Sequence, residues 1–235
     1  MKRPPPPLRL QQTRLANGVV VCTARLSHLA SSHVCVRHRG GPIHEDDTTW
    51  GMSHLLEHMV FRGTRRHKDA RAVSLAADDF GGEIDGATWR DRVVYDTRVD
   101  AGREPEAIAL LCEMLGAPRF EGLAIEKGVL REELLELVNE DGIETDADNL
   151  SAQRLFAGHG LARTIEGTVA HLDATDLKSL RRFHRETVGP DHLVVSVAGP
   201  VEHAAVVAAT ARTFGTWSSG RGPRPGVPPS PPRRA

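Results

Sequence analysis

The sequence has 235 residues, which is enough for one sizeable hydrophobic core. Its 30 lysine and arginine residues balance 31 aspartate and glutamate residues, so the charge gives no sign of binding to nucleic acid or to an anionic membrane. No run approaches the roughly 20 apolar residues that a membrane-spanning helix needs. We therefore expect an ordinary globular protein with neither kind of partner.

Prolines are concentrated at the two ends of the chain. Ten of the fifteen lie in residues 4–7 and 223–232. Consecutive prolines favour an extended polyproline conformation, and these stretches contain little that could be buried. We expect residues 1–7 and 218–235 to be disordered and residues 8–217 to form one domain. A proline-rich ligand for a partner is the alternative.

The three cysteines, Cys22, Cys35 and Cys112, are odd in number and have no C-x-x-C spacing. All three lie in apolar stretches, which predicts buried free thiols and a reducing compartment. The first residues contain a basic pair but no apolar segment of the kind found in signal peptides. We therefore expect a cytoplasmic protein.

The N-terminal part of the chain predicts strands followed by a helix. Asn17-Gly18 is a tight-turn signal between two apolar stretches, and the glycines and proline at residues 40–42 end a third. Asp46, Asp47 or Thr48 can cap the helix that follows. The three predicted strands are residues 8–15, 19–25 and 33–38.

The rest of the chain continues with helices and strands in groups. Grouped elements favour an α+β fold, in which helices pack on a mixed, largely antiparallel sheet. Strands are predicted at residues 84–89, 93–99 and 192–198. Helices are predicted at residues 68–80, 105–115, 123–138, 149–156, 175–187 and 202–214.

The helix predicted after residues 40–42 carries the stretch His54-Leu-Leu-Glu57-His58. Each helical residue advances by about 100°, so the two histidines and the glutamate between them share one narrow face. Two imidazoles at this spacing can bind one cation, and the carboxylate can take a proton from a bound water. This is the H-x-x-E-H pattern of inverted zinc hydrolases, although so short a pattern is weak by itself.

The helix predicted at 123–138 adds two carboxylates in phase with its apolar side. Glu126 and Glu133 share this side with Leu130, where a buried unpaired carboxylate costs several kcal/mol. A nearby cation explains both, whereas a solvated face explains only Glu132 and Glu136. Gly128 costs about 1 kcal/mol in a helix, which is consistent with close approach of another element.

Together these motifs resemble the pitrilysin family of zinc peptidases, the family of insulin-degrading enzyme and mitochondrial processing peptidase. The family has H-x-x-E-H followed by a liganding glutamate, and here 74 residues separate His58 from Glu133. Further matches are Leu15-Ala-Asn-Gly18, residues 51–64, residues 81–88, Tyr95, Gly167-Thr168 and residues 189–199. The similarity covers about residues 8–217.

The resemblance implies a role for each site residue. It implies that His54, His58 and Glu133 bind one Zn²⁺ per chain and leave one position for water. Glu57 would be the general base of an endopeptidase, and Glu126 would orient a liganding histidine. The edge strand with Asp85, Gly86 and Ala87 would pair with the peptide substrate.

One of these positions departs from the family pattern, because Asp85 stands where the family usually has asparagine. The aspartate would favour basic or amine-bearing peptides, or it would serve only in a turn.

Family members consist of two related halves that face each other as a clam shell around the peptide, and the sequence matches only the first half. In the family, an arginine and a tyrosine of the second half stabilise the oxyanion and hold the substrate. The only tyrosine here is Tyr95, which matches another role. We expect a homologous second-half subunit to supply these groups, or a homodimer.

Two other functions compete with a zinc endopeptidase that cuts peptides or unfolded segments. A non-catalytic scaffold subunit of a peptidase-like heterodimer is one, but such halves have generally lost the zinc motif. A silent metal-binding module is the other, and it would have no need for Glu57.

Overall fold

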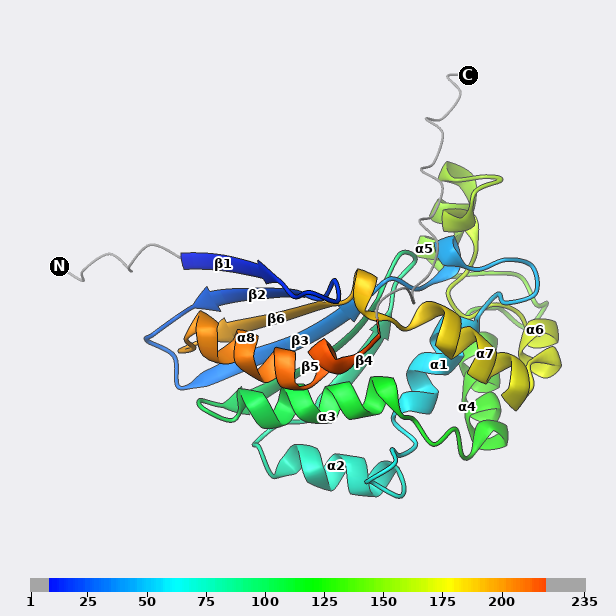
Figure 1. Cartoon of the computed structure of the whole chain (residues 1–235). Helices are drawn as coiled ribbons and strands as arrows, with labels where there is room; N and C mark the ends of the chain where they lie inside the picture. Colours follow the sequence, from blue (N-terminus) through cyan, green and yellow to red (C-terminus); the bar gives the residue numbers. More distant parts are fainter. Residues whose placement is uncertain (1–8, 219–235) are drawn as a thin grey trace.

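One six-stranded sheet forms the centre of the molecule in the computed structural model, which describes residues 9–218 (Figure 1). Its strand order is β1-β2-β6-β3-β5-β4. Within the described residues β2 and β6 pair in parallel and all other neighbours pair antiparallel, which confirms the predicted α+β class with a mixed, largely antiparallel sheet. The strands are β1 (Arg9–Arg14), β2 (Val20–Arg25), β3 (Ser31–His38), β4 (Ile84–Thr88), β5 (Val93–Asp100) and β6 (Val194–Gly199).

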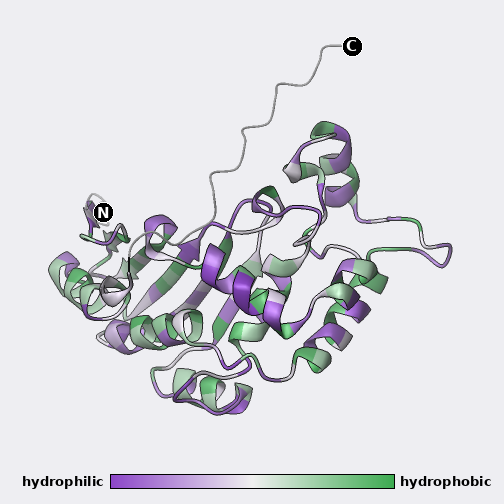
Figure 2. Ribbon diagram, turned by 45° about the vertical axis from the view of Figure 1, so that its right-hand side comes forward, coloured by the Kyte–Doolittle hydropathy of each residue, from purple (hydrophilic) through white to green (hydrophobic). Residues whose placement is uncertain are grey.

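The two faces of the sheet differ because side chains alternate along each strand. Val21, Val36 and Val195 lie on the inner face and are fully buried. Two long helices, α3 (Glu104–Gly116) and α8 (His203–Arg212), lie along this face in Figure 1. Figure 2 shows the matching alternation of hydrophobic and hydrophilic residues along strands and helices. The core therefore lies between the sheet and these helices.

The remaining helices gather mainly beyond the β4 edge. Helix α1 packs against β4, α4 and α7, while α2 lies outside α3 (Figure 1). These helices are α1 (Met52–Val60), α2 (Ala70–Asp78), α4 (Leu123–Glu136), α5 (Ala147–Leu155), α6 (Val169–Ala174) and α7 (Leu177–Thr187). Short 3-10 turns are η1 (Pro42–His44), η2 (Gly160–Ala162), η3 (Pro190–His192) and η4 (Phe214–Thr216).

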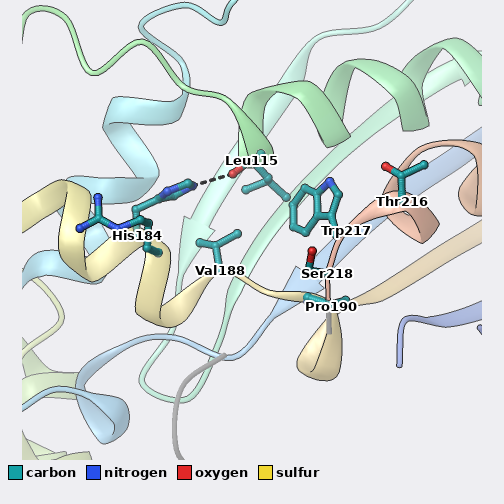
Figure 3. Close-up of a pocket in the computed structure, with 9 residues that line it drawn as sticks. Leu115, His184, Val188, Pro190, Thr216, Trp217 and Ser218 are labelled. Atoms are coloured by element: carbon teal, nitrogen blue, oxygen red, sulfur yellow. Dashed lines mark hydrogen bonds between the residues drawn. The ribbon is translucent and has the colours of Figure 1, made fainter. Parts of the chain in front are cut away.

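The end of the described chain closes against α3. A Cβ on Gly116 would lie 2.9 Å from the ring of Trp217, so the indole packs directly on the helix end. Figure 3 shows Trp217 near Leu115 in a cavity of about 290 Å³, with His184 donating a hydrogen bond to the Leu115 carbonyl (2.7 Å). The Asn17 side chain donates to the Trp217 carbonyl (3.1 Å) and ties the first hairpin to this end.

Several sequence predictions need correction. Asp46, Asp47 and Thr48 do not cap α1, because its N-cap position is Gly51. The helix predicted at 68–80 begins only at Ala70, after the capping side chain of Asp69. Helix α6, which Thr168 caps, was not predicted. The three cysteines are free, as predicted, but only half-buried.

The ends of the chain lie largely outside the residues that the structure describes. The predicted disorder concerns residues 1–7 and 218–235, and of these only Ser218 is among the described residues. Within residues 9–218, no helix combines the length and apolar character required to cross a bilayer.

Candidate metal and catalytic site

Helix α1 presents two histidines from a firmly packed base. Leu55, Leu56 and Met59 are buried in the main hydrophobic core. The i and i+4 spacing then places His54 and His58 side by side on the opposite face, with their rings edge to face and 4.8 Å between centroids. The core therefore fixes the helix that carries both imidazoles.

Helix α4 brings a carboxylate to the same place. One oxygen of Glu133 lies 3.7 Å from His54 Nε2 and the other lies 3.8 Å from His58 Nε2. One potential ligand atom from each of the three residues lies within 4.8 Å of the others. The structure thus brings together the three residues that the sequence predicted as metal ligands.

The spacing of these atoms suits a cation better than direct contacts. Distances of 3.7 and 3.8 Å are too long for hydrogen bonds. Ligands at about 2.0–2.1 Å from a tetrahedral zinc ion lie about 3.3 Å apart, close to the 3.7 and 3.8 Å between Glu133 and the two histidines. His54 Nδ1 is buried without a hydrogen-bond partner in residues 9–218, so no carboxylate lies behind this imidazole as Glu126 lies behind His58. The donor set therefore fits zinc.

Glu126 lies behind His58 and orients it. His58 Nδ1–H donates to Glu126 Oε2 (3.1 Å), which leaves the Nε2 lone pair facing His54 and Glu133. The other oxygen of Glu126 lies 3.3 Å from an Arg62 nitrogen, so the buried carboxylate has a cationic partner. A carboxylate behind a liganding histidine sets its tautomer and raises its basicity.

Glu57 is buried beside the three candidate ligand atoms. Its carboxylate accepts a hydrogen bond from the Thr88 hydroxyl (3.2 Å) and lies 3.9 Å from His54 Nε2. Burial raises the pKa of Glu57, whereas His58 and Thr88 lower it and Glu133 raises it further. Burial, together with the neighbouring His58, lowers the pKa of His54 to about 3. A neutral His54 beside a proton-accepting carboxylate suits metal binding with general-base catalysis.

Strand β4 passes directly over this carboxylate. A Cβ on Gly86 would lie only 2.6 Å from Glu57 Oε1, so the glycine allows the strand to approach. β4 is an edge strand that pairs with β5 on one side only within residues 9–218. Asp85 and Ala87 are exposed on it. The turn interpretation of Asp85 is wrong, because the residue lies inside the strand.

Two predictions about α4 were wrong in part. The Glu133 side chain is 37% exposed, so it is half-buried rather than inside an apolar stripe. Gly128 is exposed, and a Cβ there would meet nothing within 4 Å, so no other element approaches it. Glu126 is buried, as predicted.

Three supporting residues were missed by sequence reasoning. Thr88 and Arg62 lie within the matching stretches but had no predicted role, and Glu45, which accepts hydrogen bonds from the start of α1, was not predicted. Thr88 lies two residues after Gly86 on the same face of β4, which was the available signal for its contact with Glu57. Nothing local marked the other two residues.

Comparisons with known proteins agree with this geometry. The family model described as Insulinase (Peptidase family M16) matches residues 20–169, and the model described as Peptidase M16 inactive domain matches residues 175–235. A zinc protease of Streptomyces coelicolor, described as uncharacterized, is 32% identical over 84% of this chain and 43% of its own length. The beta subunit of the mitochondrial-processing peptidase of Dictyostelium discoideum is 30% identical over 83% of this chain and 41% of that subunit.

Solved structures show the same fold. A protease from Helicobacter pylori superimposes with a TM-score of 0.81 at 21% identity, covering 94% of this chain and 54% of that one. The first half of the periplasmic protease PqqL from Escherichia coli gives 0.80 at 21% identity, covering 94% and 48%. The chain spans less than half the length of the two curated relatives named above. It therefore belongs to the insulinase family of peptidases, family M16, and corresponds to its N-terminal half.

Proposed function

We propose that this chain is the catalytic half of a zinc endopeptidase that hydrolyses peptides or unfolded segments. The observation that carries the proposal is the convergence of His54, His58 and Glu133 beside the buried carboxylate of Glu57. A purely structural metal site closes with four protein ligands and needs no adjacent base. Three donors with a base next to them instead leave room for a reacting molecule.

The chemistry divides between the metal and the protein. Zinc held by these three residues would supply Lewis-acid activation of water and of the scissile carbonyl. Glu57 accepts a proton from the attacking water as the water oxygen bonds to the carbonyl carbon. It then gives this proton to the amide nitrogen as the carbon–nitrogen bond breaks. The raised pKa of Glu57 suits a group that must both take and return a proton.

The free edge of β4 is the proposed seat of the substrate backbone. An extended peptide that hydrogen-bonds to residues 85–87 becomes an added strand, and its carbonyl then lies next to Glu57 because Gly86 touches that side chain. Asp85 is exposed on this strand and would attract a basic or amine-bearing peptide. Folded proteins lack such a free extended segment.

We propose that oxyanion-stabilising groups come from a second half. Tyr95 is fully buried beneath the site, and burial, with Glu57 nearby, raises the pKa of its hydroxyl well above the usual value. It is therefore not placed to contact a substrate on β4. A homologous subunit that supplies an arginine and a tyrosine, or a second copy of this chain, would complete the site, because loss of one oxyanion donor costs about 10²–10³ in rate.

Replacement of Glu57 by glutamine tests the proposal. The amide keeps the size of the side chain but cannot accept the proton, so we expect zinc binding to remain and kcat to fall about 10²–10⁴-fold. Zinc content by atomic absorption and cleavage of a quenched fluorescent peptide library are measured on the chain together with its second half. The exposed Glu132→Gln variant is the matched control.

The same experiment separates the alternatives. Normal cleavage by Glu57→Gln would refute the base assignment. Zinc binding without any cleavage, by the native chain in the presence of its partner, would favour the metal-binding module. A scaffold subunit would neither bind zinc nor cleave the peptides. Full activity of the purified monomer would refute the need for a second half.

A further inference from the structure

The N-terminus of α1 is held by a carboxylate outside the helix. Its N-cap residue, Gly51, has φ of +85° and no side chain to satisfy the first backbone N–H groups. Glu45, six residues earlier, accepts from Gly51 N (2.9 Å) with one oxygen and from Ser53 N (2.8 Å) with the other. Its side chain is buried. Glu45 thus caps the N-terminus of α1 although it lies outside the helix.

No side chain at position 51 could replace this arrangement. A Cβ on Gly51 would lie 2.6 Å from the Glu166 carbonyl oxygen, because the segment before α6 presses against the helix start. Gly51 also adopts the left-handed conformation that other residues rarely tolerate. The close packing therefore excludes an ordinary capping residue and leaves the N–H groups to Glu45.

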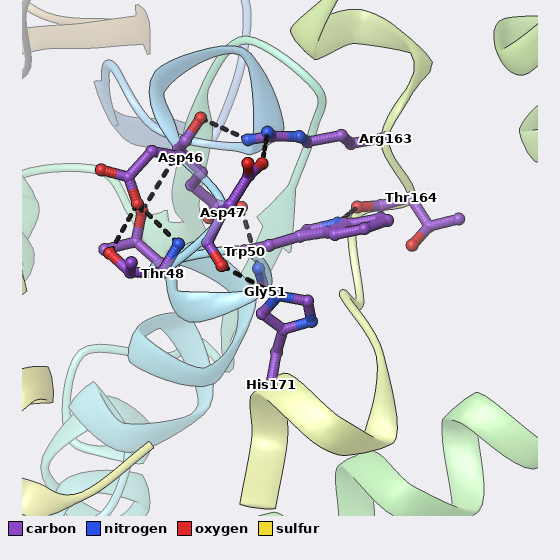
Figure 4. Close-up of polar contacts among 10 residues, drawn as sticks. Asp46, Asp47, Thr48, Trp50, Gly51, Arg163, Thr164 and His171 are labelled. Carbon is purple, nitrogen blue, oxygen red and sulfur yellow. Dashed lines mark hydrogen bonds and ion pairs between the residues drawn. The ribbon is translucent and has the colours of Figure 1, made fainter. Parts of the chain in front are cut away.

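Glu45 is itself anchored by the segment that follows η2. The Arg163 guanidinium donates to the Glu45 carbonyl (2.6 Å) and also pairs with Asp47 (Figure 4). Trp50 donates from its indole N–H to the Thr164 carbonyl (2.8 Å). One distant segment, residues 163–164, thereby holds the loop that carries the carboxylate.

The first turn of α1 matters because it carries a predicted zinc ligand. His54 is the third residue of the helix and follows Ser53, whose N–H is bound by Glu45. His54 Nδ1 has no partner in residues 9–218, so no carboxylate orients this imidazole. His58, one turn later, is oriented separately by Glu126. The position of His54 therefore depends on the helix start.

We propose that Glu45 is a positioning residue of the metal site, which acts by fixing the first turn of α1 and with it the His54 imidazole. The inference rests on the proposed function, because it assumes that His54 binds zinc. Burial raises the pKa of Glu45 to about 7, against the effect of the hydrogen bonds from Ser53 and Gly51 and of Arg163.

Zinc affinity of four proteins tests the inference: the native chain, Glu45→Ala, Glu45→Gln and Asp46→Asn. We expect Glu45→Ala to weaken zinc binding about 10–100-fold, as loss of a supporting residue in a metal site does. In Glu45→Gln the amide oxygen can still accept from one of the two backbone N–H groups, but the NH₂ group faces the other. We therefore expect a smaller loss of zinc affinity than in Glu45→Ala. Asp46, which is exposed and accepts only within its own loop, should have no effect.

A double-mutant cycle distinguishes positioning from general destabilisation. In the His54→Ala background, Glu45→Gln should not weaken zinc binding further, because its effect passes through that imidazole. In the Glu126→Gln background the two losses should add. The absorption spectrum of the cobalt-substituted protein gives an independent readout, and we expect Glu45→Gln to change it while the Asp46→Asn spectrum stays native.

Each outcome has a definite meaning. Equal losses in the two backgrounds, or native zinc affinity in both Glu45 variants, would overturn the positioning role. If Glu45→Ala does not fold, the Glu45→Gln cycle still decides. Absence of zinc binding by the native chain would instead refute the proposed function itself.

Discussion

Helices α1 and α4 hold the site residues in two very different environments. His54, Glu57 and His58 lie on α1, and Glu126 and Glu133 lie on α4. Seven of the nine residues of α1 are buried, whereas α4 buries only Glu126 and Leu130 among fourteen. α4 also exposes apolar side chains, including Ile125 (58%) and Leu135 (55%). α1 is therefore held by the core, while α4 is held by a few contacts and by the charges that it brings to the site.

The difference explains how one site can be both precise and adaptable. Core packing sets the position of the helix that carries His54 and His58 before any metal arrives. Glu133 is half-exposed, and no hydrogen bond to either histidine holds it. A cation would thus complete the connection between α1 and α4.

The largest expected effect is on zinc affinity. Glu133→Ala removes a proposed ligand, so we expect a loss of more than the roughly 10–100-fold that loss of a residue supporting a ligand typically causes. Because Glu133 contributes little packing, the unfolding free energy of the metal-free protein should hardly change. Competition with a fluorescent zinc chelator measures affinity, and Glu132→Gln is the control. Equal zinc affinity in the Glu133→Ala and native proteins would remove Glu133 from the ligand set.

A smaller effect concerns the stability of the two helices. Leu55→Ala should lower the unfolding free energy by about 3 kcal/mol, because a fully buried leucine leaves a cavity. Ile125→Ala on α4 should change it by less than about 0.5 kcal/mol, because that side chain is mostly exposed. Urea unfolding with chelator present measures both. Similar losses in the two variants would contradict the comparison.

The smallest expected effect is on the pH dependence of stability, through His38 on β3. Burial lowers the pKa of His38 to about 4, partly opposed by its hydrogen bond to the Arg39 carbonyl. In the unfolded chain the His38 imidazole has a pKa near 6.5 and so binds a proton more readily than in the folded protein. Acidification from pH 6.5 towards 4 therefore favours unfolding. The metal-free native protein should lose about 2 kcal/mol more than His38→Gln between pH 7 and 5. If the unfolding free energies of the native protein and of His38→Gln, measured in urea, change in parallel with pH, His38 does not cause the loss of stability in acid.

Local sequence patterns determined much of the fold and the centre of the site. Alternation in residues 33–38, the turn at Asn17-Gly18 and the mid-chain helical stretches became the expected elements. The pair His54 and His58 with Glu57 follows from helical periodicity, which needs no tertiary information. Glu133 lay within reach of prediction because of its phase relative to Glu126 on one helix and its spacing from the motif.

Only the tertiary structure decided what supports these residues. Glu45 reaches the start of α1 because the loop between them folds back, and Arg163 holds that loop from more than a hundred residues away. Gly86 touches Glu57, and Arg62 pairs with Glu126, through packing between separate elements. The half-exposure of Glu133 and the open surroundings of Gly128 were also invisible, because periodicity shows which residues share a face but not what covers that face.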